Sequence, residues 1–304
     1  MTGKGMRQGV SKWSLERKRR TFCYLSLLPV FGIFTIIRII PIARTFILSL
    51  TDASLISLKS NFIGFENYKN LITDDLFHQA LVNTTLFAFS TVCLSVVLGL
   101  LLSLLMKRKT TLSPLYETIY FLPVITPMVP VAIIWKWIYD PSYGLINYML
   151  SWFGVKPIGW LVYPNIALWA IVILSVWKVV GYNMMIFLVG LRNIPSMYYE
   201  AALIDGAIGA NLFRYITLPL LKPILLFITV VTTINSYNVF TQVYVMTTGL
   251  QGAPGNTVRV LVYDIWENAF RYSRMGYASA EAVILFSIIL LLTLVQFKIV
   301  KSES

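Results

Sequence analysis

Six apolar runs divide the sequence, and each is long enough to cross the hydrocarbon core of a bilayer, which takes about 20 helical residues. We place them at residues 22–48, 79–106, 115–139, 165–191, 219–246 and 276–299. Only 12% of the 304 residues are charged, against about 25% in an ordinary soluble domain. The sequence therefore predicts an all-α polytopic membrane protein. Its six transmembrane helices form one domain over residues 22–304, after a basic N-terminal tail over residues 1–21.

The basic residues lie mostly on one side of the predicted spans. With the N-terminus placed in the cytoplasm, 15 of the 25 lysines and arginines fall in cytoplasmic segments and six in outer segments. An excess of Lys and Arg marks the cytoplasmic loops of membrane proteins. The net charge of +12 is thus a topology signal rather than a sign of nucleic-acid binding. We expect both termini in the cytoplasm.

Residue types that usually carry catalysis or bind metals are scarce. Cys23 and Cys93 fall in predicted spans and suit packing, and His78 is the only histidine. This leaves no ligand set typical of zinc. The sequence also has no GxxxxGK[ST], GxSxG or HExxH motif. We expect that this chain is not an enzyme, binds no metal or cofactor, and does not itself hydrolyse ATP.

Three prolines interrupt the third predicted span. Pro123, Pro127 and Pro130 are spaced by four and three residues, which places them on one side of a helix. Each removes a backbone donor and bends the helix. In a membrane the freed carbonyls must face other helices or a wet cavity. Two interpretations stay open: a bent helix that lines a pathway, and a bent helix that only packs.

The fifth predicted span carries an unusual polar load. At 100° per residue, Thr232, Asn235, Asn238, Gln242 and Gly249 fall in a sector of about 120°. Amide side chains in hydrocarbon are costly unless they face protein or water. This face therefore lines either a helix interface or a translocation pathway.

Two charged residues also lie inside predicted spans. Lys178 falls in the fourth span, and Glu281 falls in the sixth, five residues after its start. Ionisable residues within a membrane span usually mark a functional site. The alternative is that each side chain snorkels to the interface or forms an ion pair.

Between the fourth and fifth predicted spans lies the stretch EAALIDGAIGANLFRYITLP, residues 200–219. Pro195 is typical of a helix start, and Gly206 lies where that helix would end, because glycine tolerates a left-handed cap. Ala201 and Ala202 give a surface that another backbone can approach closely. An ordinary connecting loop is the alternative, but such a loop seldom needs a capped helix, a glycine and a second helix that ends at Leu-Pro.

This stretch resembles the cytoplasmic loop of permease subunits of binding-protein-dependent ABC importers, with Glu200-Ala201-Ala202, Gly206 and Leu218-Pro219 in the register of the family motif. Further segments are similar to sugar-type permeases for maltose, other oligosaccharides and glycerol 3-phosphate. They stand in the family's order and are residues 61–87, 135–147, 187–207 and 276–289. The segment MTTGLQGAPGNT departs from the family pattern Leu-Thr-x-Gly-Gly-Pro.

The resemblance implies a type I importer fold in a prokaryotic plasma membrane, with a five-helix core and an additional N-terminal helix. It also implies a second permease, two ATP-binding subunits that hold ATP and Mg²⁺, an extracellular solute-binding protein, and a sugar or sugar-like substrate. In this family the loop at about 192–218 contains a coupling helix that docks on the ATPase. The expected coupling residues are Glu200, Ala201, Ala202, Asp205 and Gly206. The expected pathway residues are Thr232, Asn235, Asn238 and Gln242, with Tyr237 as an off-sector residue able to stack on a sugar ring.

Two rival functions belong to other classes. A secondary transporter driven by H⁺ or Na⁺ would use Lys178 or Glu281, but leaves the segment from Glu200 to Pro219 without a purpose. An intramembrane enzyme would need a nucleophile, a metal set or a general base within the spans, and the sequence offers none.

Overall fold

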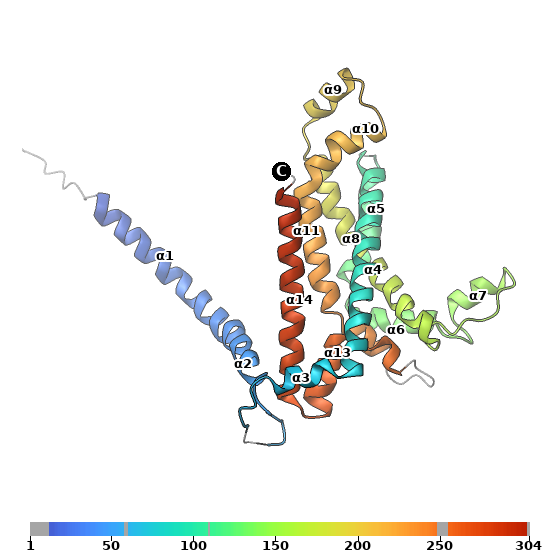
Figure 1. The fold of residues 1–304 in the computed structure, drawn as a ribbon. Coiled ribbons are helices and arrows are strands. Elements are labelled where there is room, and N and C mark those ends of the chain that lie inside the picture. Colours follow the sequence, from blue (N-terminus) through green and yellow to red (C-terminus); the bar gives the residue numbers. More distant parts are fainter. Residues whose placement is uncertain (1–11, 58–59, 109, 248–254, 303–304) are drawn as a thin grey trace, which may run out of the picture.

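The computed structural model describes residues 12–57, 60–108, 110–247 and 255–302, and these form helices joined by loops (Figure 1). Five helices are long and apolar enough to cross a membrane, and a sixth span is a broken helix pair. The prediction of an all-α protein with six spans is confirmed. A single antiparallel bridge, Thr51 to Phe62, is the only strand-like pairing in the described part of the chain.

The first half of the chain holds three spans and two short helices. Its helices are α1 (Lys12–Phe34), η1 (Thr35–Ile39), α2 (Ile40–Leu48), α3 (Glu66–Ile72), α4 (Asp75–Met106), α5 (Ser113–Ile125), α6 (Met128–Ile138) and α7 (Leu145–Ser151). The first span runs through α1, η1 and α2 without a break. The long α4 begins where the Asp74 side chain accepts hydrogen bonds from the backbone N–H groups of Leu76 and Phe77, as an N-cap does.

The second half holds three more spans and the connecting elements. Its helices are α8 (Pro164–Arg192), α9 (Ser196–Ile204), α10 (Ala210–Leu212), η2 (Phe213–Thr217), α11 (Leu218–Tyr237), α12 (Thr241–Thr247), η3 (Gly255–Val258), α13 (Leu261–Trp266), η4 (Glu267–Arg271) and α14 (Met275–Ser302). Helix α9 lies at one end of the bundle and α3 with α13 at the other (Figure 1). We name these the α9 end and the α3 end.

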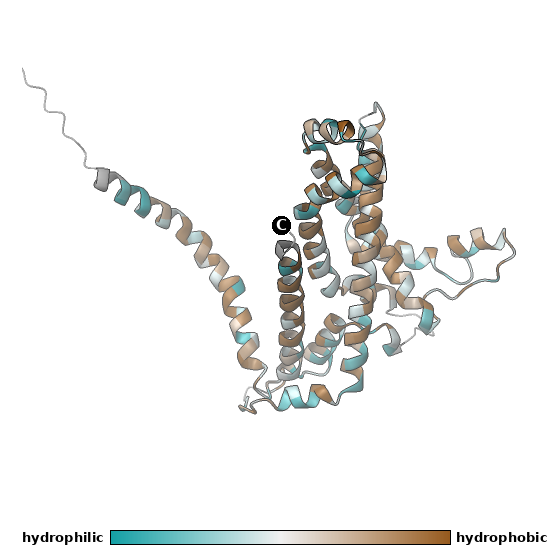
Figure 2. Ribbon diagram, turned by 45° about the horizontal axis from the view of Figure 1, so that its top comes forward, coloured by the Kyte–Doolittle hydropathy of each residue, from teal (hydrophilic) through white to brown (hydrophobic). Residues whose placement is uncertain are grey.

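Helices α4, α8, α11, α14 and the α5–α6 pair form the bundle, while α1 points away from it (Figure 1). The first span meets the bundle only near its end, where Phe46 of α2 packs edge-on against Phe286 of α14 at 6.0 Å between ring centroids. None of the most apolar window of the first span is buried. Apolar residues predominate along the spans (Figure 2), and many of them are exposed. The fold is thus a five-span core with an additional N-terminal helix.

The third span is a broken helix rather than the bent one that the prolines suggest. Helices α5 and α6 meet at 98° around Thr126 and Pro127, so the three prolines share no helix face. The Lys178 ammonium of α8 donates to the carbonyl oxygens of Pro123, at 2.8 Å, and Thr126, at 2.7 Å. This intramembrane lysine therefore satisfies carbonyls that the break leaves without helical partners.

The fifth span, Ala210–Tyr237, begins and ends earlier than predicted. Helix α11 ends at Tyr237, and the chain turns through Asn238 and Val239 before α12 begins at Thr241. The angular sector predicted for one helix therefore does not extend past Tyr237, because the 100° step applies only within a helix. Gly249, the last residue of that sector, lies outside the described residues.

Candidate functional site

The loop between α8 and α11 forms a capped helix at the α9 end, as its sequence predicts. Pro195 is the N-cap of α9, and the helix ends with Gly206 at a positive φ of 79°. The N–H of Gly206 donates to the Leu203 carbonyl at 3.1 Å, and that of Ala207 to the Ala202 carbonyl at 2.8 Å. This pair of bonds is a Schellman motif, which requires a left-handed residue at the position of Gly206.

Helix α9 presents most of its surface to solvent. Ala202 is buried within the chain, whereas Glu200, Ala201, Asp205 and Gly206 are exposed. Its apolar side chains are unusually open: Ile204 is 87% exposed and Met197 65%. Ile208, in the turn that follows, is 69% exposed. An exposed apolar patch at the tip of a loop is typical of a protein contact surface.

Two contacts tie this loop to the spans. The Lys107 ammonium, at the end of α4, lies 3.7 Å above the centre of the Tyr199 ring, and the Thr217 hydroxyl donates to the Tyr199 hydroxyl oxygen at 3.4 Å. At the end of α8, the Arg192 guanidinium pairs with Glu117 of α5 at 2.7 Å. A force on α9 therefore reaches α4 through Lys107 and the start of the fifth span through Thr217, whereas the Arg192–Glu117 pair joins α8 to α5.

The predicted pathway residues separate into two groups. The Thr232 hydroxyl is buried and donates to the Asn183 amide oxygen at 3.4 Å, and the Asn183 amide donates to the Ser95 hydroxyl at 3.1 Å. These contacts join α11, α8 and α4 inside the bundle. Tyr237 is also buried and packs in an apolar cluster, so its ring has no open face.

The second group lies at the break after α11. Asn235 and Asn238 are exposed, and the Asn238 amide donates to the Ile234 carbonyl at 2.7 Å. Gln242 of α12 is half-buried and donates to the Ser175 hydroxyl of α8 at 3.4 Å. The structure thus brings amide side chains to a break in a span, and leaves two of them open.

An aromatic cluster beside this break is not apparent from the sequence. Phe240, Tyr244, Tyr263 and Trp266 lie with ring centroids 5.2–6.4 Å apart. The residues come from α12, α13 and the turn before α12. Each of the two pairs, Phe240 with Tyr244 and Tyr263 with Trp266, has a helical spacing, but only the fold brings the two pairs together.

A buried ionic cluster at the α3 end was also missed. The Arg259 guanidinium contacts Asp264 and Glu267, and all three side chains are more than 90% buried. The Asn268 amide donates to the Asp264 and Glu281 carboxyl groups. Burial raises the pKa of Asp264, although Arg259 acts in the opposite direction. Glu281, which the sequence marks as a charged residue within a predicted span, is therefore a fully buried member of a polar cluster.

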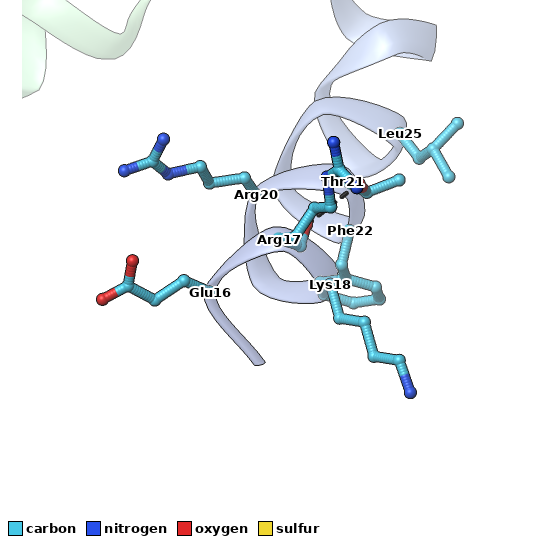
Figure 3. Close-up of a pocket in the computed structure, with 7 residues that line it drawn as sticks. All are labelled: Glu16, Arg17, Lys18, Arg20, Thr21, Phe22 and Leu25. Atoms are coloured by element: carbon cyan, nitrogen blue, oxygen red, sulfur yellow. Dashed lines mark hydrogen bonds between the residues drawn. The ribbon is translucent and has the colours of Figure 1, made fainter. Parts of the chain in front are cut away.

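Other candidate sites lack the required geometry. Within the described ranges, no three His, Cys, Asp or Glu side chains are placed to hold a metal ion. A hollow of about 1050 Å³ lies beside α1, and the described residues that line it all belong to that helix. The side chains of Glu16 and Arg20 extend to one side of the helix there and that of Lys18 to the other (Figure 3). One helix with diverging side chains does not enclose a ligand.

A family profile described as a binding-protein-dependent transport system inner membrane component matches residues 95–302. The chain belongs to this family. It is thus the permease subunit of an ABC importer and a multi-pass membrane protein. This confirms the expectation of a transport subunit rather than an enzyme, since members of the family leave ATP hydrolysis to separate subunits. The membership also favours the importer over the ion-driven secondary transporter.

Relatives of this permease cover almost its whole length. The probable ABC transporter permease protein YurN of Bacillus subtilis is 35% identical over 283 residues, 92% of this chain and 96% of the relative. The trehalose/maltose transport system permease protein MalF of Thermococcus litoralis is 35% identical over 94% of this chain and 95% of its own. The lactose transport system permease protein LacF of Rhizobium radiobacter is 33% identical over 94% and 96%.

A solved structure supports the fold. The chain matches a bacterial alginate ABC transporter in complex with an alginate pentasaccharide-bound periplasmic protein, with a TM-score of 0.81 and 23% identity. The match covers 92% of this chain and 94% of the other. The five-helix core with an additional N-terminal helix is therefore the type I ABC importer permease fold.

Proposed function

We propose that this permease forms part of the translocation pathway for a sugar or sugar-like solute in an ATP-driven importer of a prokaryotic plasma membrane. Three relatives support the substrate class, because their names specify trehalose/maltose, lactose and arabinooligosaccharides. The observation that carries the coupling mechanism is the exposed α9 helix, which is apolar at its tip and contacts two spans at its base. A subunit without a nucleotide-binding motif needs such a joint to an ATPase.

The α9 end faces the cytoplasm in this proposal, together with both termini. The orientation rests on the basic residues, since Lys107, Arg108, Arg192 and Arg214 all lie at the α9 end. Two ATP-binding subunits, which hold ATP and Mg²⁺, contact Glu200, Ala201, Asp205 and Gly206 together with the apolar tip. Ala202 supports α9 from within, because it is buried in the chain itself.

The pathway runs past the break between α11 and α12. Asn235 and Asn238 are open at this break and offer amide donors and acceptors to sugar hydroxyl groups. Thr232, Tyr237 and Gln242 support it through the buried contacts described above. We expect Asn235→Leu and Asn238→Leu to lower uptake while assembly with the ATPase is kept. Normal uptake by both variants would show that these amides only pack.

A second permease completes the pathway, and a solute-binding protein delivers the solute at the α3 end. The first span supports a contact with another membrane subunit, because its apolar surface is left uncovered by its own chain. Ile33, Ile36 and Ile37 are each 60% exposed or more. These side chains suit lipid on one side and a second permease on the other.

Uptake into vesicles tests the proposal. The complete importer, purified from its host, is reconstituted with ATP inside, solute-loaded binding protein outside and no ion gradient. We expect accumulation of a labelled oligosaccharide that stops when the ATP is replaced by a non-hydrolysable analogue. Uptake that needs a proton or sodium gradient and no ATP would contradict the proposed function.

A further inference from the structure

A polar groove of about 540 Å³ lies on the surface of the α3 end. Three segments line it: the loop after α2, one face of α3, and the turn between η4 and α14. Among the described residues, neither the α9 loop nor the α11–α12 break lines the groove. It is therefore separate from both sites discussed above.

The walls of this groove are fixed to one another. The Asn67 amide of α3 donates to the carbonyl oxygens of Ser49 and Thr51, each at 2.9 Å. The Gly276 N–H of α14 donates to the Ala53 carbonyl at 2.9 Å. A Cβ at Gly276 would overlap the Thr51 carbonyl oxygen, so α14 approaches the loop more closely than any other residue allows. The groove is thus preformed.

Two carboxylates give the groove acidic positions. Asp52 accepts from the Asn61 backbone N–H and side-chain amide, and these bonds lower the pKa of Asp52. Burial acts to raise the pKa of Asp74, but hydrogen bonds from Tyr277, Leu76 and Phe77 outweigh it, and the pKa is lowered. Both groups are therefore ionised near neutral pH, and each carboxylate keeps room for a further donor on at least one oxygen.

Neutral and basic donors complete the lining. Asn70 of α3 and Arg274 of the turn are both exposed and border the groove. The turn itself is held in an unusual conformation, with Ser273 at a φ of 58°. The groove thus combines two carboxylates, one amide and one guanidinium on rigid supports. It suits a polar loop with a basic side chain for the carboxylates and a carbonyl or carboxylate for Arg274.

We propose that this groove is a docking site for the solute-binding protein and receives a loop of that protein that carries a lysine or arginine. The inference rests on the proposed function, which places the α3 end outside the cell. Charge complementarity supports a basic loop. The walls of the groove come from the end of the first span and the start of the last. A loop bound in the groove would therefore contact both of these spans.

Site-specific crosslinking in the complete importer tests the location. A photo-reactive residue replaces Asn70, which lines the groove, or Ile72, which is 72% exposed on the same short helix but does not line it. The importer is held in nanodiscs with solute-loaded binding protein. We expect crosslinks from position 70 to a segment that contains a lysine or arginine, and several-fold fewer from position 72. Equal yields, or crosslinks from position 70 to the solute, would overturn the proposal.

Charge substitution tests the chemistry. Asn70→Lys places a cation among the carboxylates and should repel a basic loop, so the binding-protein concentration for half-maximal ATPase stimulation should rise about tenfold. The matched Ile72→Lys control should change it less than twofold. Values are normalised to assembled complex. If Asn70→Lys behaves as the control does while stimulation is intact, the groove is not the docking site and the proposed function stands. A wild-type complex that no binding protein stimulates would overturn both.

Discussion

The two ends of the helix bundle are held together in different ways. At the α3 end, buried polar side chains join segments that are far apart in the sequence: the Asn83 amide of α4 donates to the carbonyls of Thr257 and Arg259, and Tyr277 of α14 donates to Asp74. At the α9 end, the Lys107 ammonium lies over the Tyr199 ring of α9, and a half-buried ion pair joins α8 to α5. The contacts of Asn83 are buried, whereas those at the α9 end are partly open to solvent.

This difference indicates that the α9 end can move against the spans and that the α3 end is rigid. Buried polar networks are costly to break, because a polar group that loses its partner stays out of water without a compensating hydrogen bond. Exposed ion pairs and cation–π contacts are each worth about 1 kcal/mol or less. The α9 helix can therefore shift against the spans at small cost, whereas α13, η4 and the start of α14 form one rigid unit. Substitutions at each end test this contrast.

The largest effect is expected for Arg259→Met at the α3 end. It leaves Asp264 and Glu267 buried without their shared cation, which should lower the free energy of unfolding by about 3–5 kcal/mol. Thermal unfolding in detergent measures this. Arg271→Met is the matched control, because Arg271 pairs with the same Glu267 but is 63% exposed, so it should change little. Equal effects of the two substitutions would contradict the rigid-unit interpretation.

The second prediction compares two apolar positions of α9. Ala202→Asp puts a carboxylate in a buried position and should destabilise the loop by about 3 kcal/mol, which opens it to protease. Ile204→Asp places the same charge on an 87% exposed position, so the loop should stay folded while the ATPase subunits are lost on purification. Proteolysis and subunit retention together separate the two effects. If the Ile204→Asp variant retains the ATPase, the apolar tip is not part of the contact with the ATPase.

The structure of the α9 end could largely be predicted from the sequence, whereas little of the α3 end could. The α9 helix, its Pro195 start and its Gly206 cap follow from local propensities that act within a few residues. The ionic cluster joins Arg259 to Glu281 across 22 residues, and α4 supplies Asn83 from still farther away. Such contacts depend on how the spans pack, which periodicity does not determine.

The breaks in the spans show the same limit. Pro127 marks the α5–α6 break in the sequence, although its angle does not follow from three prolines. The turn at Asn238 has no proline or glycine beside it, so the sequence reads as one continuous helix. The role of Lys178 follows only from the break that it caps.

The third prediction concerns the cap of α9. Gly206→Val forces a branched side chain into a left-handed conformation and should cost about 1 kcal/mol or more. We expect transport and binding-protein-stimulated ATP hydrolysis to fall together, with normal membrane insertion. Gly32→Val is the control, because Gly32 lies within α1, has no positive φ and has open space around it. Wild-type coupling in Gly206→Val would mean that the cap is not part of the joint.

The smallest effect is expected for Lys107→Met, which removes the cation above the Tyr199 ring. The contact is partly exposed, so its loss should cost about 0.5–1 kcal/mol and leave thermal unfolding of the whole chain almost unchanged. The change should instead appear locally, as a two- to fivefold faster amide hydrogen exchange over α9. Arg108→Met, at the next and fully open position, should not alter that exchange. If Lys107→Met lowers the global stability as much as Arg259→Met does, the α9 end is as tightly integrated as the α3 end, and the contrast between them fails. If exchange in α9 is unchanged, Tyr199 is held by Thr217 alone, and the path of force from α9 to α4 has to be sought elsewhere.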